Sequence, residues 1–251
     1  MGTFVIQFIH GLVYGMLLFL VGSGLTLVFG MMNVLNLAHV SFYMLGAYFS
    51  YQMLQWVGNF WVGLIVCPIF VGLLGILMER FLLRRVHEAG HVQEFVITFG
   101  ILFALNEAIK WVWGTETLSV PIPSALSGSI MIMGNIYPAY RLFILFFSLA
   151  VLAFLAFILM KTRLGITVRA MVSDRDMVSA LGTNTPFVFM LVMGIGTWLA
   201  GLAGVIAGPF LTISPGMGIE ILTDCFIVTA TGGLGSVLGA VVVSFLIGQL
   251  S

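Results

Sequence analysis

Long uninterrupted apolar runs dominate this sequence and leave few folds open to it. A membrane-spanning helix needs roughly 20 consecutive apolar residues, because the hydrocarbon core of a bilayer is about 30 Å thick. The runs lack the strict alternation of membrane β-strands, so helices are expected. We predict an all-α integral membrane protein, a polytopic helical bundle of about eight transmembrane or broken helices. The runs occupy 4–29, 40–57, 60–78, 93–113, 138–160, 186–208 and 219–231, and an eighth, short of a full span, begins at 235.

Composition and charge point to lipid as the surroundings of this chain. Hydrophobic residues make up 61% of the sequence and charged residues 7%, whereas a soluble domain carries about 25% charged residues. Nine basic and nine acidic residues cancel, and the basic ones form no stripe interleaved with aromatics. Nucleic acid is therefore not an expected partner. Cys67 and Cys225 lie inside apolar runs, where a thiol behaves as a small hydrophobe.

The basic residues predict which loops face the cytoplasm. Cytoplasmic loops of membrane proteins carry an excess of Lys and Arg, and here the third and fifth runs are followed by such clusters. Counting from these loops places the N-terminus, the 114–137 loop and the 209–218 turn outside, with Arg141 as a mild exception. The clusters are Arg80, Arg84 and Arg85, and Lys161, Arg163, Arg169 and Arg175.

Small residues recur at spacings that let membrane helices approach closely. Gly196, Ala200, Gly204 and Gly208 follow one another every four residues in the sixth run. Such a stripe predicts a helix-packing face, and it is also a candidate face for contact with a second subunit.

The pentapeptide "HEAGH" at 87–91 spells the H-E-x-x-H pattern of zinc proteases. That chemistry needs a helix and a third ligand. The pentapeptide instead lies in a short polar loop and carries a glycine, so we interpret it as a solvated cytoplasmic turn with no metal. The chain has neither a Walker A loop nor a G-x-S-x-G elbow, and we assign no catalytic residue.

The loop that follows the fifth run has a helical pattern of its own. The segment 167–182 predicts a short amphipathic helix on the cytoplasmic surface, ending at Gly182. Either it is a connector lying on the membrane, or it docks in a groove of another protein. Its apolar residues are Val168, Met171, Val172, Val178 and Leu181.

Pairs of charged residues one helical turn apart occur inside two of the runs. Glu107 and Lys110 lie one helical turn apart near the outer end of the fourth run, so they are expected to neutralise each other. An interfacial anchor is favoured over a substrate site there, because Trp111 and Trp113 follow. Glu220 and Asp224 near the start of the seventh run present the same choice. The sequence "GGLGS" at 232–236 predicts a broken helix or a tight turn.

A polar strip interrupts apolar sequence between the first two runs. Asn33, Asn36 and His39 share one side of a helix, and Ser41 follows. They either cap a break after Gly30 and bond to neighbouring helices, or line a polar translocation path, and both roles are compatible. Asn36 is the best candidate for the path, because its amide both donates and accepts hydrogen bonds.

Four segments of the chain resemble one family of transporters. They are "GLTLVFGMMNVLNLAHVSFYMLGAY" at 24–48, "ITFGILFAL" at 97–105, "RAMVSDRDMVSALGTN" at 169–184 and "GGLGSVLGA" at 232–240. Their order and spacing are similar to those of permeases of branched-chain amino acid ABC importers, of the LivH type.

The resemblance implies a role as one permease subunit in a bacterial inner membrane, crossing it many times. A periplasmic binding protein would deliver the solute, and two cytoplasmic ATPases would drive alternating access. ATP and Mg²⁺ would bind the ATPases, so no cofactor is expected in this chain. The second permease subunit is expected to be a distinct paralogue.

The resemblance further implies that 169–182 is the ATPase-coupling loop, which includes Arg169 and Met171. Asp176, Met177, Val178 and Gly182 fall at the places of the E-A-A-x-x-x-G motif of related importers, with only the acidic charge and the glycine kept.

The resemblance also predicts further apolar sequence and a short basic tail after Ser251. We therefore expect 1–251 to be a single permease domain that lacks its C-terminal end. Urea, short amides and other small organic solutes are alternative substrates. A passive channel, or an intramembrane protease that uses "HEAGH", would be a different class of protein.

Overall fold

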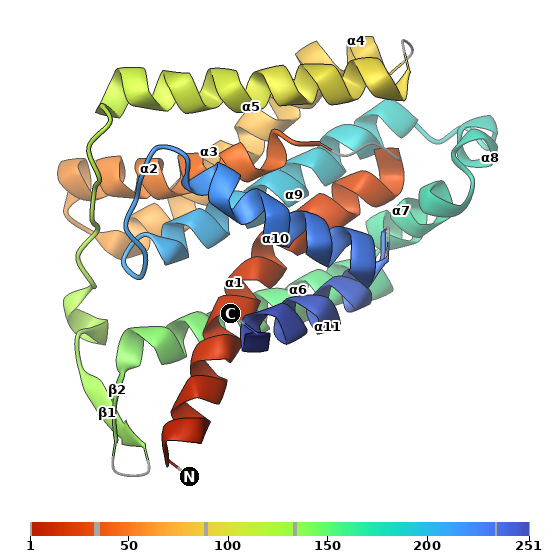
Figure 1. Cartoon of the computed structure of the whole chain (residues 1–251). Helices are drawn as coiled ribbons and strands as arrows, with labels where there is room; N and C mark the ends of the chain where they lie inside the picture. Colours follow the sequence, from red (N-terminus) through yellow and green to blue (C-terminus); the bar gives the residue numbers. More distant parts are fainter. Residues whose placement is uncertain (1, 33–35, 88–89, 133–134, 234, 251) are drawn as a thin grey trace.

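The computed structural model describes residues 2–32, 36–87, 90–132, 135–233 and 235–250, which form a helical bundle (Figure 1). Within these residues five helices, one of them extended by short turns, are long and apolar enough to cross a membrane. They are α1 (Gly2–Met32), α3 (Phe60–Met78), α5 (His91–Trp113), α6 (Ala139–Lys161) and α9 (Thr185–Ala207). The remaining helices of the bundle are α2 (His39–Val57), α10 (Met217–Gly232) and α11 (Val237–Leu250).

The helices match the apolar runs of the sequence to within a few residues at each end. A π-helical turn, Glu79–Leu83, and α4 (Arg84–Val86) continue α3 into the first basic loop. The predicted polytopic helical fold is therefore confirmed.

Helix α9 lies at the centre and packs on α1, α2 and α3. The contact depends on glycine: a Cβ at Gly204 would lie 2.0 Å from the Tyr43 carbonyl oxygen, and one at Gly196 would lie 2.9 Å from the carbonyl of Gly24. The predicted small-residue stripe is thus a packing face, but its partners lie within the same chain. The stripe does not supply the expected contact with a second subunit.

The chain re-enters the bundle between α1 and α2. The ring of His39, the first residue of α2, lies against Gly24 of α1. Gly24 precedes Met32, the last described residue of α1, by eight residues, which is about 12 Å of helix. Helix α2 therefore begins inside the bundle. Among the described residues α1 reaches Met32 and α2 begins at His39, so the helix is interrupted in the predicted region after Gly30.

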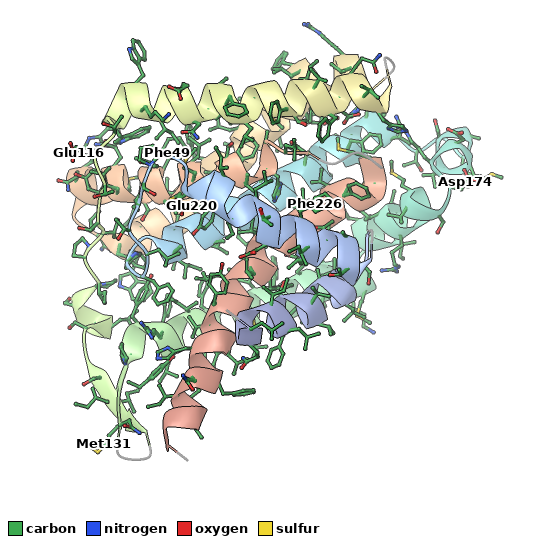
Figure 2. All side chains as sticks on the ribbon, viewed as in Figure 1. Phe49, Glu116, Met131, Asp174, Glu220 and Phe226 are labelled. Carbon is green, nitrogen blue, oxygen red and sulfur yellow. The ribbon has the colours of Figure 1, made fainter. Side chains whose placement is uncertain are left out.

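The loops segregate to two ends of the molecule. Figure 1 places α4, α7 (Arg163–Ser173) and α8 (Arg175–Ala180) together at one end, so the two predicted basic loops share one side. The N-terminus and the antiparallel hairpin of β1 (Ser129–Ile132) and β2 (Asn135–Pro138) lie at the other end. The hairpin is regular structure in the segment that the sequence predicts as the outer 114–137 loop. Figure 2 shows the same separation between Asp174 and Met131.

The outer end is closed by contacts between loops. Leu118 and Ile213 exchange backbone hydrogen bonds of 2.8 and 2.9 Å, which tie the loop after α5 to the loop after α9. The predicted pair forms on α5, where Lys110 Nζ donates to Glu107 Oε1 at 2.5 Å. Trp111 is exposed beside this pair, which agrees with an interfacial anchor.

Most outward faces of the bundle are apolar. Ile65 of α3, Phe99 of α5 and Phe157 of α6 are among many large exposed hydrophobic side chains. Soluble monomers do not expose apolar surface on this scale, so lipid must cover these faces.

We predict that Gly204→Ala destabilises the bundle, because the new methyl group overlaps backbone of α2. Overpacking of this kind costs about 1–3 kcal/mol. The measurement is the midpoint of thermal unfolding in detergent. Gly100→Ala is the matched control, since a Cβ there meets nothing within 4 Å. Equal midpoints for the two variants would contradict the packing role of the stripe.

Candidate functional site

The predicted coupling segment forms two helices, α7 and α8, instead of one. Asp174 separates them, because its Oδ1 accepts from the Met177 backbone N–H at 2.9 Å and caps α8. At the other end Gly182 has φ +84°, and its N–H donates to the Ser179 carbonyl. The Thr183 N–H donates to the Val178 carbonyl, which completes a Schellman motif. The predicted end of the helical segment at Gly182 is confirmed.

The apolar residues of this segment point in two directions. Val168, Met171 and Val178 are buried against the chain itself. Met177 is 58% exposed and Leu181 is 77% exposed. Val172 of α7 is also exposed, at 41%, so the apolar residues of the segment do not form one continuous face, and Met177 and Leu181 are the most exposed of them. The role of the segment in ATPase coupling stays a prediction.

Three contacts fix the two helices to the bundle. Arg169 donates a hydrogen bond to the Leu159 carbonyl at the end of α6. The Arg175 guanidinium lies 4.5 Å from the ring centre of Phe189 in α9, a cation–π contact. Val172 of α7 lies beside Gly235, where a Cβ would be 3.4 Å from Val172 Cγ1. Helix α7 thus touches the turn between α10 and α11.

The first histidine of "HEAGH" is held between two buried carboxylates. His87 Nε2 lies 2.9 Å from Glu79 Oε1, and Nδ1 lies 3.0 Å from Glu94 Oε2. This cluster joins the end of α3 to the start of α5. The His87 ring also packs on Phe189, at 5.6 Å between ring centres. The cluster is therefore linked through Phe189 to Arg175 of α8.

Both ring nitrogens of His87 are occupied by carboxylates. Burial by itself lowers the pKa of His87, but the hydrogen bonds and negative charges of Glu79 and Glu94 outweigh burial and raise the pKa to about 9. His91 is exposed in the first turn of α5, while Glu88 and Ala89 lie outside the described residues. Within the residues described, no three potential ligands are arranged to hold a metal ion.

The polar strip of the sequence lies inside the bundle. Asn36, His39 and Ser41 are almost fully buried. Asn36 Nδ2 lies 3.7 Å from Met193 Sδ, whereas its Oδ1 and the Ser41 hydroxyl have no hydrogen-bond partner among the described residues. The structure brings these three residues together near the start of α2. Asn33 lies outside the described residues, and the path role stays a prediction.

Sequence reasoning did not identify the polar face of α10. Glu220, Thr223 and Thr231 are exposed on this helix, and Asp224 is half-buried. Their spacing places them along one side of the helix, and we call these four residues the polar face. Figure 2 shows Glu220 on α10 with no other helix in front of it. The two acids four residues apart were a signal, but their position near a helix end suggested an interfacial anchor.

The polar face begins at a pocket near the outer end. This outer pocket has a volume of about 390 Å³ and lies between α1, α2, α10 and the outer loops. Glu220, Tyr14 and Tyr43 line it. The Tyr14 hydroxyl donates to Asp224 Oδ2 at 2.8 Å. Tyr43 is only 2% exposed, and its hydroxyl makes no hydrogen bond with any described residue.

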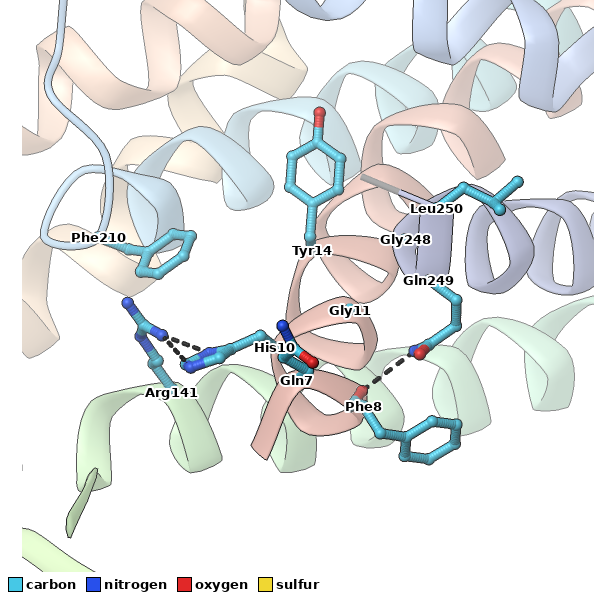
Figure 3. A pocket seen from close by; sticks show the side chains of 10 residues that line it. All are labelled: Gln7, Phe8, His10, Gly11, Tyr14, Arg141, Phe210, Gly248, Gln249 and Leu250. Carbon is cyan, nitrogen blue, oxygen red and sulfur yellow. Dashed lines mark hydrogen bonds between the residues drawn. The ribbon is translucent and has the colours of Figure 1, made fainter. Parts of the chain in front are cut away.

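A second pocket shares Tyr14 with the outer pocket (Figure 3). Its volume is about 570 Å³, and it lies beside the ends of α1, α6 and α11. Arg141 donates a hydrogen bond to the His10 ring and lies 5.0 Å from the ring centre of Phe210. The one basic residue that departs from the predicted charge pattern is thus placed at the wall of a polar pocket.

The apolar outer faces and the helices long enough to cross a membrane are those of a polytopic membrane protein. The chain belongs to the family described as branched-chain amino acid transport system / permease component, whose model matches residues 7–251.

The chain is also similar to several permease proteins of branched-chain amino acid transport systems. The high-affinity branched-chain amino acid transport system permease protein LivH of Salmonella typhimurium is 28% identical over 98% of this chain and 84% of its own length. LivH of Escherichia coli K12 is also 28% identical, with the same coverage. The high-affinity branched-chain amino acid transport system permease protein BraD of Pseudomonas aeruginosa is 26% identical over 96% of this chain and 83% of its own length. No solved structure matches.

We predict that His87 makes the stability of the protein pH-dependent. The folded pKa, about 9, lies above the ordinary value of 6.5, so the stabilisation is fully present below pH 6.5 and is lost as the pH rises through 9. The measurement is the midpoint of thermal unfolding in detergent between pH 6 and 9.5. The midpoint should fall over this range in the native protein.

In His87→Gln the fall should disappear. His91→Gln is the control, because His91 is exposed and the ion pairs of Glu79 and Glu94 among the described residues are with His87. An unchanged pH dependence in His87→Gln would show that the cluster does not hold the proton.

Proposed function

We propose that this chain is the permease subunit of an ABC importer that moves branched-chain or similar amino acids across a bacterial inner membrane. A periplasmic binding protein delivers the solute, and two cytoplasmic ATPases drive alternating access. The family and the names of the similar proteins support the permease role and the solute class. ATP and Mg²⁺ bind to the ATPases, and this chain contributes binding and movement.

The exposed apolar surface of α8 is the observation that carries the proposal. Met177 and Leu181 stand at the end of the molecule where the basic loops gather. Lipid covers exposed apolar residues on the outer faces of the bundle, but these two lie in a polar segment beside Asp174, Arg175 and Asp176. A groove on another protein is the natural cover for such a short helix. A passive channel needs no such surface.

The contacts of α7 and α8 supply a route from the docking surface to the membrane interior. Arg175 of α8 contacts Phe189 of α9, the central helix. Val172 of α7 lies beside Gly235, in the turn that follows α10. A displacement of the two surface helices by an ATPase therefore reaches both the centre of the bundle and the helix that carries the polar face.

The polar face of α10 supports a second permease subunit. Charged side chains facing lipid near the middle of a membrane are costly, so they normally face protein or water. A distinct, paralogous permease that covers this face leaves the translocation path between the two subunits. The path then has its outer end at Glu220 and its inner end near Thr231.

Asn33, Asn36, His39 and Ser41 remain proposed contributors to the path. We predict that Asn36→Leu leaves the complex assembled and lowers solute uptake, since the substitution keeps the volume and removes an amide in the bundle interior. Met193→Leu is the control, because it removes the sulfur that contacts Asn36 and leaves the amide in place. Normal uptake in Asn36→Leu would assign the strip to scaffolding.

We predict that the double variant Met177→Asp and Leu181→Asp uncouples transport. Charge at both positions should prevent docking, so that uptake and solute-stimulated ATP hydrolysis by the complex fall at least tenfold, about 1.4 kcal/mol. The fold should survive, since both side chains are exposed. The measurements are uptake and hydrolysis in proteoliposomes.

The matched control is Ser173→Asp with Ser179→Asp, which adds the same two charges to exposed positions without removing apolar surface. Coupled transport at the native rate in the Met177 and Leu181 variant would refute docking through α8.

A further inference from the structure

The outer pocket combines negative charge with unused hydrogen-bonding groups. The Glu220 carboxylate lines the pocket and forms no ion pair with any described residue. Tyr43 lines the same pocket, and its hydroxyl has no hydrogen-bond partner among the described residues. The residue is only 2% exposed. A buried side chain holds this hydroxyl at the pocket wall, and without a partner in the protein the hydroxyl is free to form a hydrogen bond with a ligand.

The chemistry of the wall selects the kind of ligand. A carboxylate accepts hydrogen bonds and attracts positive charge, while a primary ammonium group has three N–H donors and no acceptor. Three further hydroxyl groups line the pocket, on Thr117, Thr212 and Ser214. A carboxylate surrounded by hydroxyl oxygens therefore matches an ammonium group.

The remaining wall is apolar. Leu211, Met217 and Ile221 line the pocket beside Glu220. A volume of about 390 Å³ lies within the range of small-molecule sites. An aliphatic side chain fits against these three residues while its ammonium group contacts the carboxylate.

We propose that the outer pocket binds the α-ammonium group of the amino-acid solute, with Glu220 as its acceptor and Tyr43 as a further hydrogen-bonding partner. This inference rests on the proposed function and adds the residues that receive the solute from outside. Asp224 lies one helical turn, about 6 Å, deeper along the polar face and is oriented by the Tyr14 hydroxyl. It is the next acceptor along α10.

The test measures occupancy of the pocket directly. Thr212→Cys places an exposed thiol in the pocket wall, and the native Cys67 and Cys225 are buried. The complex purified from its source organism, carrying this variant, is treated with a membrane-impermeant thiol reagent. Free L-leucine at millimolar concentration should slow labelling about tenfold, whereas 4-methylpentanoate, which lacks the ammonium group, should not.

Adding Glu220→Gln should abolish the protection by L-leucine. Adding Glu107→Gln is the matched control, because Glu107 is an exposed carboxylate on α5 away from the pocket. Tyr43→Phe should weaken protection without removing the charge. Equal protection by 4-methylpentanoate, or full protection with Glu220→Gln in a folded complex, would overturn the proposal.

ATP-driven leucine uptake by the same complex, without the cysteine substitution, tests the proposed function separately. Uptake without pocket protection refutes only the ammonium site. Absence of ATP-driven uptake of any amino acid refutes the proposed function.

Discussion

The close approach of α9 to its neighbours is the contact on which the rest of the structure depends. Helices in a bilayer gain little from the hydrophobic effect when they associate, so their packing relies on van der Waals contact between backbones. Gly196 and Gly204 allow this contact against α1 and α2. Because α9 also packs on α3, a single helix fixes the positions of three others. The start of α2 is held inside the bundle at the level where α1 meets α9.

A rigid centre leaves function to the parts that it does not bury. Two such parts lie at opposite ends of α10. One end carries Glu220 beside the outer pocket, and the other end is followed by a turn in which Gly235 lies beside Val172 of α7. One helix therefore connects a polar surface within the membrane to the segment proposed to receive force from an ATPase. The cluster of His87, Glu79 and Glu94 joins α3 to α5 at the cytoplasmic end and touches α9 through Phe189.

The sequence was sufficient for the fold because spanning length and apolar continuity are strong, local signals. The helix boundaries, the break before α2, the turn at 232–236 and the sidedness of the basic loops all followed from these signals and from charge. The outer β-hairpin was missed, since its short strands carry no comparable pattern. The division of the coupling segment at Asp174 was missed although aspartate is a common helix cap.

The candidate site was less predictable for a physical reason. Periodicity shows which residues share a helix face, but it does not show what that face meets. Met171 and Met177 are both apolar residues of the coupling segment, yet only Met177 is exposed. The Gly196–Gly208 stripe was correctly identified as a packing face, but its partners proved to be α1 and α2. Glu220 and Asp224 were recognised as unusual, and only the position of α10 showed that they face outward together.

The central claim is that this permease works as one part of an ATP-driven complex. The most direct measurement is native mass spectrometry of the complex purified in mild detergent from its source, with the subunits identified. The account predicts one copy of this chain, one paralogous permease and two ATPases. A chain that purifies without an ATPase and transports solute without nucleotide would contradict it.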